Sequence, residues 1–330
     1  MMRSLVAPVL GEMRAGQILA VLEIDPALAA QAGEASRGQV SMALNAVLFA
    51  DLLNRVPPAA RYVADIAAQG ERIRFDHGAL RTIDGKTGSL PRGHLAFARI
   101  LDPLGYGVAG LYPLESLKMT GRAYCHADFP ETVPQFFVSE LHVDRLPAEA
   151  QAAANRVFGN SRDPLGPIER RLLDKLAQDG ACPADLVAAG LPGLARAFGR
   201  WHGTPALADY GLLLRHSPEG AWIATEGNAF NHATDRVGDV AVLAARLKAE
   251  GVAMKRDVEV SASGRVRQTA MLAATVVREF RCGDGSPVQR EVPGSFYEFI
   301  SREVDPATGQ LDLSFDSGNA AGIFAVTGAG

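Results

Sequence analysis

Residues 75–82 read Phe-Asp-His-Gly-Ala-Leu-Arg-Thr, and they place His77 four residues before Arg81. A spacing of four brings two side chains to the same side of a helix and equally to the same side of a strand. A neutral imidazole is a good ligand for transition metals, and a guanidinium can hold a carboxylate through two parallel hydrogen bonds. The pair indicates half of a site for an acidic substrate beside a metal. A structural histidine near a solvated arginine is the alternative explanation of the same spacing.

The composition is that of an ordinary globular enzyme and excludes several classes of partner. The 330 residues are 48% hydrophobic and 21% charged, with a net charge of -4. This charge offers no basic surface, so we expect no nucleic-acid partner. Cys125, Cys182 and Cys282 lie far apart, which predicts no disulfide framework and favours a reducing cytoplasm. Because no stretch approaches the roughly 20 apolar residues of a spanning helix, we expect a cytoplasmic protein without a membrane segment.

We interpret residues 1–330 as a single catalytic domain. Helices are expected in two parts of it. The first, about 1–69, is rich in Ala, Leu and Val and carries few groups capable of chemistry, so it is interpreted as a helical cover. The second, about 147–200, is interpreted as a helical insertion between two sheet-forming parts. A shorter helix is predicted after Asp239 and before Gly251, since these residues are suitable caps.

Strand character is expected around and between these helices. Residues 107–145 alternate strand-like runs with turn signals, and Phe136-Phe137-Val138-Ser139-Glu140-Leu141 is a strong strand candidate. Strand character is also expected to return from Leu212 and to include residues 221–225. A long β-rich run begins at Gln268. The pattern predicts a mixed protein of helices and strands.

Glu298 stands among large apolar and aromatic residues in Phe296-Tyr297-Glu298-Phe299-Ile300. A carboxylate buried among apolar residues needs a metal ion or an arginine as its partner, whereas a carboxylate on an exposed strand edge would need neither. Together with His77 and His232 it forms a set of two imidazoles and one carboxylate. This is the ligand set of non-haem Fe(II) oxygen chemistry. Zinc is the competing metal and would indicate hydrolysis by an activated water, and the spacing does not choose between them.

Two other polar pairs have residue types and a spacing that suit the same role. His126 with Asp128, and His142 with Asp144, are alternate residues that would share one face of a strand. We favour polar positions on an exposed strand or turn for both pairs. Ser139 and Glu140 are interpreted either as groups that orient a ligand histidine or as partners in structural hydrogen bonds.

Six ordered segments of the chain resemble one protein family, from about residue 70 to the C-terminus. The segments are His-Gly-Ala-Leu-Arg at 77–81, Gly-Arg-Ala-Tyr-Cys-His-Ala-Asp-Phe-Pro at 121–130, Phe-Phe-Val-Ser-Glu-Leu at 136–141, Asn-His-Ala-Thr at 231–234, Val-Pro-Gly-Ser-Phe-Tyr-Glu-Phe-Ile at 292–300 and Asn-Ala-Ala-Gly-Ile-Phe at 319–324. The family is the 2-oxoadipate dioxygenase/decarboxylase group of the vicinal oxygen chelate superfamily. Six segments in the same order are more specific than any single motif.

The resemblance implies a fold and a set of site residues. The fold would be α+β, with two βαβββ-like halves closing around a metal and with N-terminal and inserted helices outside. The family's iron ligands fall on His77, His232 and Glu298, and the metal would be ferrous iron, Fe(2+). Arg81 would hold a substrate carboxylate, and Gly318 falls where the family closes its pocket near the substrate.

The resemblance also implies a reaction. We expect oxidative decarboxylation of a 2-oxo dicarboxylic acid with O2, with 2-oxoadipate giving 2-hydroxyglutarate and CO2 in lysine catabolism. The rival enzyme is a metal-dependent isomerase or lyase of the glyoxalase type, which would consume no O2. A third alternative is a non-catalytic protein that binds small acids.

Overall fold

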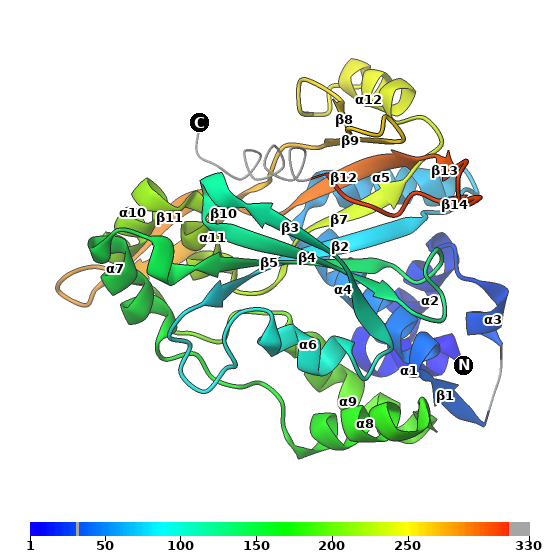
Figure 1. Cartoon of the computed structure of the whole chain (residues 1–330), viewed down its shortest axis with the longest axis horizontal. Helices are drawn as coiled ribbons and strands as arrows, with labels where there is room; N and C mark the ends of the chain where they lie inside the picture. Colours follow the sequence, from blue (N-terminus) through cyan, green and yellow to red (C-terminus); the bar gives the residue numbers. More distant parts are fainter. Residues whose placement is uncertain (31–32, 317–330) are drawn as a thin grey trace.

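The computed structural model describes residues 1–30 and 33–316, and one mixed sheet lies at its centre (Figure 1). The sheet has eight strands in the order β3-β4-β5-β2-β7-β12-β9-β8. In chain order these strands are β2 (Phe75–Asp84), β3 (Tyr106–Leu114), β4 (Met119–His126), β5 (Gln135–His142), β7 (Phe230–Arg236), β8 (Glu259–Val260), β9 (Val266–Ala270) and β12 (Phe296–Arg302).

The sheet is built from two halves that repeat one order of elements. The first half runs β2, helix α6 (Leu95–Leu101), β3, β4 and β5, and the second runs β7, helix α12 (Val240–Ala249), β8, β9 and β12. In each half the first strand pairs with the last in parallel, while its other pairs are antiparallel. Strands β2 and β7 join the halves as an antiparallel pair. This arrangement confirms the predicted α+β fold of two βαβββ-like halves.

Within the described residues, three small pairs of strands lie outside the main sheet. The hairpin of β10 (Thr275–Arg281) and β11 (Pro287–Pro293) interrupts the second half between β9 and β12. Strand β1 (Glu34–Ser36) pairs with β6 (Ala181–Pro183). Strand β13 (Val304–Asp305) pairs with β14 (Gln310–Leu311) close to the end of the described chain.

Helices cover both faces of the sheet (Figure 1). Those before the sheet are α1 (Met2–Leu10), α2 (Glu12–Val21), α3 (Pro26–Ala29), α4 (Arg37–Arg55) and α5 (Pro57–Ala68). Those between the halves are α7 (Ala148–Phe158), α8 (Pro167–Asp179), α9 (Ala184–Ala197), α10 (Leu207–His216) and α11 (Pro218–Glu226). Helix α4 begins at a capping box in which Ser36 and Gln39 each satisfy the other's backbone N–H. No helix of the described residues is long and apolar enough to cross a membrane.

The two faces of the sheet belong to different apolar clusters, because side chains alternate along a strand. Leu80, Phe136 and Val138 pack in the cluster that contains helix α4. Ala79 and Phe137 pack in a second cluster, which contains residues of α7, α10 and α11. His77 and Arg81 are in step with Ala79 along β2, so they point toward the α11 side.

The expected strand between 212 and 225 is wrong, because this segment is helical. Helix α10 spans Leu207–His216 and α11 spans Pro218–Glu226. Ser217 caps α11 through the backbone N–H of Gly220, and Pro218 occupies its first turn, where a missing N–H costs nothing. Residues 221–224 are buried on every side. A short, continuously apolar run does not distinguish a buried strand from a buried helix. The predicted helix after Asp239 is confirmed as α12, with the Asp239 carboxylate accepting from two of its first N–H groups.

Candidate metal centre

Three side chains from the middle strands of the sheet converge at one point. His77 on β2, His232 on β7 and Glu298 on β12 each present a possible ligand atom, and these atoms lie within 4.8 Å of one another. The exposed fractions of the three residues are 2%, 4% and 0%. The register explains the meeting, because Ala79 pairs with His232 and Glu298 pairs with Thr234 on adjacent strands. The set singled out in the sequence is therefore brought together.

The contacts among these groups leave one nitrogen of each histidine facing the carboxylate. The Nε2 atom of His77 lies 3.2 Å from Oε2 of Glu298, and Nε2 of His232 lies 3.5 Å from the same oxygen. The Thr234 hydroxyl donates to that oxygen at 2.7 Å. On the outer side of His77, Nδ1 lies 2.9 Å from Oδ1 of Asp76. A carboxylate in this position fixes the orientation of a ligand imidazole and directs Nε2 inward.

The donor set fits a metal ion. Among the described residues, both ring nitrogens of His232 and Oε1 of Glu298 are buried without a hydrogen-bond partner. Leaving such an atom unsatisfied costs about 1–3 kcal/mol, and a bound cation would remove this cost for the atoms it contacts. Two imidazole nitrogens and one carboxylate oxygen suit Fe(II), and they suit Zn(II) as well. The fit therefore supports a divalent metal without selecting one.

The protonation states of two groups also favour a metal. Burial lowers the pKa of His232 to about 3, and the charges of His77 and Arg81 act in the same direction. Burial alone would raise the pKa of Glu298, but the nearby His232 and the hydrogen bonds from His77 and Thr234 lower it overall. His232 is thus neutral and Glu298 ionised near neutral pH, which are the forms that bind metals.

His77 differs from His232 because it has acidic neighbours on both sides. Burial alone would lower its pKa, but the hydrogen bonds to Asp76 and Glu298 outweigh burial and raise the pKa. A metal at this site would replace a proton on Nε2, since only a neutral imidazole is a ligand. The Asp76 carboxylate would remain on the other nitrogen and compensate part of the metal's charge.

Two bulges in the β2–β7 pair aim these side chains. The register shifts between Phe75 and His77, which leaves Asp76 as an extra residue in β2. It shifts again between Ala79 and Leu80, where Asn231 is extra in β7. Bulges often re-aim side chains next to functional sites. The first bulge places the Asp76 carboxylate beside His77. The second lets Phe230 pack on the α4 side although His232 points to the other face.

Gly78 is required by the close approach of the two strands. A Cβ atom at this position would lie 2.2 Å from the ring of Phe230. The Phe230 ring packs over Gly78 on the face opposite to His77 and contacts Phe75 and Phe136. A side chain at 78 would push this ring and strand β7 away, and His232 would move with the strand.

Arg81 lies in the same buried region, two residues beyond Ala79 on β2. Its side chain is 1% exposed, and its Cζ atom lies 5.1 Å from the centre of the Trp222 ring on α11. Asn228 donates to its backbone carbonyl at 2.7 Å. Burial lowers the pKa of Arg81 to about 10, against the opposing charge of Glu219, so the guanidinium stays charged at neutral pH. A buried cation beside a flat aromatic face is suited to hold a carboxylate.

The internal repeat shows that the centre is asymmetric. His77 pairs with Gln135 in the first half, as His232 pairs with Phe296 in the second. Two residues further along the last strand stand Phe137 in the first half and Glu298 in the second. The first half thus supplies one candidate ligand and the second supplies two. Because an apolar ring occupies the fourth equivalent position, the first half offers no second ligand at the position that matches Glu298.

The other residues singled out in the sequence either lie outside the described residues or contact groups other than the three candidate ligands. Gly318 lies outside the described residues. Asp128 forms an ion pair with Arg37 at 2.6 Å, and His142 hydrogen-bonds Asp84 at 2.9 Å. Glu140 bonds Arg122 and His94, so the structural hydrogen bond is the correct alternative for it.

Sequence reasoning missed two groups around the centre. These are Thr234, which contacts Glu298, and Arg302, which bonds Asp76 on the outer side of His77. Thr234 stands two residues after His232, and this period-2 spacing was the available signal for its place on the same face. The link between Arg302 and Asp76 depends on a bulge and had no signal in the sequence.

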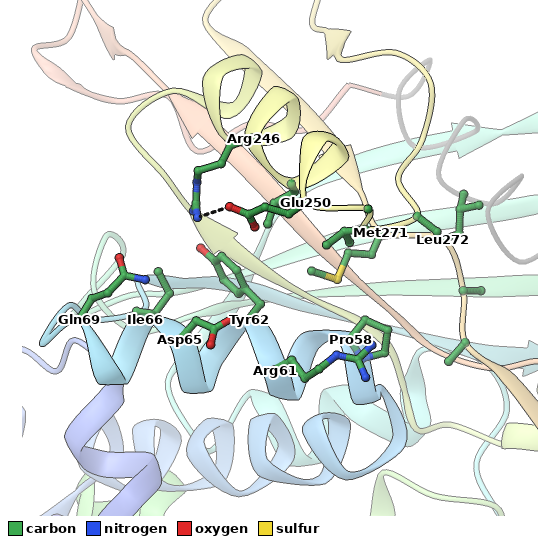
Figure 2. Close-up of a pocket in the computed structure, with 16 residues that line it drawn as sticks. Pro58, Arg61, Tyr62, Asp65, Ile66, Gln69, Arg246, Glu250, Met271 and Leu272 are labelled. Atoms are coloured by element: carbon green, nitrogen blue, oxygen red, sulfur yellow. Dashed lines mark hydrogen bonds and ion pairs between the residues drawn. The ribbon is translucent and has the colours of Figure 1, made fainter.

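A separate cavity of about 540 Å³ lies between α5, α12 and the 271–274 segment (Figure 2). Tyr62 and the ion pair of Arg246 with Glu250 are among its lining groups. The Tyr62 ring packs against Tyr297 and Phe299, whose side chains point away from the Glu298 face of β12. This cavity is therefore on the opposite side of the sheet from the candidate metal centre.

Comparisons with known proteins agree with the fold and identify the family. The sequence model of the 2-oxoadipate dioxygenase/decarboxylase family matches residues 47–311. A solved structure described as a glyoxalase superfamily protein, from Ralstonia eutropha JMP134, is 50% identical, with a TM-score of 0.92 over 96% of this chain and 98% of that one.

Two more distant structures share the fold. Hydroxyglutarate synthase from Oryza sativa, in complex with 2-oxoadipate, is 19% identical, with a TM-score of 0.70 over 91% of this chain and 96% of that one. The enzyme of the same name from Pseudomonas putida, also with 2-oxoadipate, is 18% identical, with a TM-score of 0.60 over 90% and 74%. A search of curated proteins found no match. Since the family model covers most of the sequence, the chain belongs to the 2-oxoadipate dioxygenase/decarboxylase family.

Proposed function

We propose that the protein is a non-haem Fe(II) dioxygenase that decarboxylates a 2-oxo dicarboxylic acid. In the expected reaction, 2-oxoadipate and O2 give 2-hydroxyglutarate and CO2, which balances all atoms, and we propose that this reaction serves lysine breakdown. The observation that carries the proposal is the buried convergence of His77, His232 and Glu298 with unsatisfied donor atoms, in a chain of this family. The two hydroxyglutarate synthase structures that contain 2-oxoadipate support the choice of substrate.

The three converging residues would hold the iron. When bound, Fe(II) would supply the oxygen chemistry that side chains lack, while the protein orients and shields the reactants. Asp76 would hold His77 in the tautomer that keeps Nε2 free, and Thr234 would hold the Glu298 carboxylate. The Phe296 ring lies 4.7 Å from the His232 ring and would help to exclude water.

Arg81 would hold the substrate carboxylate that lies far from the 2-oxo group. Its guanidinium is buried, charged and braced by Trp222, and its charge reaches His232. Fixing the far end of a diacid places the reacting carbon, and misplacement by about 1 Å can cost about a hundredfold in rate. Gly318 is proposed to contact the substrate from the chain beyond residue 316.

Oxygen uptake with 2-oxoadipate and Fe(II) tests this function, with an anaerobic reaction as the control. We expect one O2 consumed and one CO2 released per 2-oxoadipate. Conversion of a substrate without O2 would instead support the isomerase or lyase alternative, which the 50% identical glyoxalase superfamily protein keeps open. Metal binding without turnover of any 2-oxo acid would support a non-catalytic acid-binding protein.

The Arg81→Ala variant tests the role of the arginine separately. We expect unchanged Fe(II) binding and a KM for 2-oxoadipate raised at least about tenfold, since a charged hydrogen bond contributes about 1.5–3 kcal/mol. Arg267→Ala is the matched control, because Arg267 pairs with Glu303 at the surface. Unaltered kinetics in Arg81→Ala would remove Arg81 from the substrate site.

We also propose that residues 1–330 act as a single catalytic domain in the cytoplasm, with about 1–69 as a helical cover and about 147–200 as a helical insertion. The packing of α4 and α11 on opposite faces of the same sheet supports the single domain. A single cooperative unfolding transition by calorimetry and circular dichroism is expected. Two separated transitions would contradict it.

A further inference from the structure

Residues 311–316 cross the first half of the sheet beside the candidate metal centre. Gln135, the strand partner of His77, donates from Nε2 to the carbonyl of Leu313 at 3.2 Å. The backbone N–H of Phe315 donates to the Tyr112 hydroxyl at 3.1 Å. The segment is thus anchored to strands β3 and β5 of the first half.

One arginine joins this segment to the outer side of the metal centre. Arg302 donates from Nη1 to the carbonyls of Asp312 and Ser314, at 2.9 and 2.8 Å. Its Nε and Nη2 atoms donate to the Asp76 carboxylate at 3.0 and 2.9 Å. The Arg302 side chain is 0% exposed and that of Asp76 is 2% exposed. Asp76 in turn contacts His77 at 2.9 Å, so a continuous chain of bonds runs from the segment to a candidate ligand.

The Phe315 ring completes the contact between the segment and the centre. Its centroid lies 4.8 Å from the His77 ring and 4.9 Å from the Phe137 ring. The Arg302 guanidinium carbon lies 5.2 Å from the same ring. Phe315 therefore covers the side of the centre where the first half carries Phe137 in place of a carboxylate. Arg302 also holds the carbonyl of Ser314, the residue before Phe315.

We propose that Arg302 is a positioning residue that couples the placement of residues 311–316 to the orientation of His77. The inference rests on the proposed function in that His77 is taken to bind the metal. An Asp76 carboxylate held in place by Arg302 orients the His77 ring for the metal. In the other direction, a metal bound to His77 strengthens the hydrogen bond between His77 and Asp76, and this bond fixes Asp76 and therefore Arg302. Because coupling between two sites is reciprocal, metal binding must also order the segment.

Arg302→Lys separates this role from simple charge compensation. A lysine keeps a cation beside the buried Asp76, which protects the fold from an uncompensated charge. Its ammonium is a single compact centre and cannot reproduce the planar fork that reaches a carboxylate on one side and two carbonyls on the other. Arg278→Lys is the matched control, because Arg278 also holds a buried carboxylate, Glu226, through Nε and Nη2, but in the β10–β11 hairpin.

The experiment measures the affinity for Co(II), and it measures the amide hydrogen exchange of residues 311–316 with and without Co(II). In the wild type and in Arg278→Lys, Co(II) is expected to slow exchange of this segment. In Arg302→Lys the segment should exchange at least about tenfold faster and no longer respond to Co(II), and Co(II) affinity should fall about 10–100-fold, as for other groups that orient a metal ligand. Phe315→Ala keeps the Arg302 bonds, so it should retain the response to Co(II).

Each outcome bears on one of the two proposals. A wild type that binds Co(II) without slower exchange at 311–316 would overturn the coupling whatever the variants do. Arg302→Lys with wild-type exchange and affinity would overturn it as well. A wild type that binds neither Co(II) nor Fe(II) would overturn the metal centre itself, and with it the proposed function.

Discussion

The two halves of the sheet share one topology but differ in what they bring to the centre. Each places a histidine near the start of its first strand, His77 in one and His232 in the other. On its last strand, the second half carries Glu298 where the first carries Phe137. A repeated scaffold therefore fixes where ligands can stand, and single substitutions decide how many there are. The centre thus has three candidate ligands and one aromatic position.

The largest effect is expected from removing the carboxylate of the second half. Glu298→Gln should lower Fe(II) affinity by more than about a hundredfold and abolish oxygen uptake, because even residues that only orient ligands contribute about 10–100-fold. Phe137→Leu, at the matching position, should leave metal affinity within about threefold of the wild type. Equal affinities of Glu298→Gln and wild type, measured by anaerobic titration, would exclude Glu298 as a ligand.

Phe137→Glu would make the halves alike. The new carboxylate would fill a coordination position, so metal should bind at least as tightly while oxygen uptake falls at least about tenfold. Without metal the variant should unfold more readily, because a buried charge lacks compensation. Thermal unfolding with and without metal measures this, and Phe137→Gln controls for the loss of the ring. Undiminished oxygen uptake would show that the position does not face the metal.

Asp235 offers another contrast between the halves, since Leu80 occupies the matching position of the first half. Burial raises the pKa of Asp235 to about 7, although the Tyr62 hydroxyl and the Arg74 backbone N–H oppose this shift. In the unfolded chain this carboxyl group loses its proton near pH 3.9. The stabilisation that the protonated Asp235 gives the folded protein is therefore lost as the pH rises from about 4 to 7, and the free energy of unfolding falls by up to about 4 kcal/mol. Asp235→Asn should flatten this part of the pH–stability curve. An unchanged slope in denaturant unfolding would contradict the shifted pKa.

The smallest effect concerns the residue that follows each histidine, Gly78 in the first half and Ala233 in the second. Gly78→Ala should lower the free energy of unfolding by about 1–3 kcal/mol, because its Cβ would overlap the Phe230 ring. Ala233→Gly should cost only about 0.5–1 kcal/mol through backbone entropy. Denaturant unfolding compares the two, and a fully stable Gly78→Ala would mean that the strands can separate without cost.

Much of the centre could be predicted from the sequence because its residues sit in local patterns. The apolar neighbours of Glu298 pointed to it as a candidate without deciding between burial and an exposed edge, and the shared face of His77 and Arg81 followed from their spacing. The outer contacts could not be predicted in this way. Asp76 reaches His77 and Arg302 through a bulge, and a bulge changes the side-chain alternation on which spacing arguments depend. The apolar run at 221–224 was misassigned because a fully buried element shows no periodicity.

Oxygen consumption in the presence of 2-oxoadipate and Fe(II) measures whether the His77, His232 and Glu298 centre is that of a dioxygenase. We expect equal amounts of O2 consumed, CO2 released and 2-hydroxyglutarate formed by the wild type, and none of the three by Glu298→Gln. Turnover of 2-oxoadipate by the wild type under strictly anaerobic conditions, or undiminished oxygen uptake by Glu298→Gln, would contradict it.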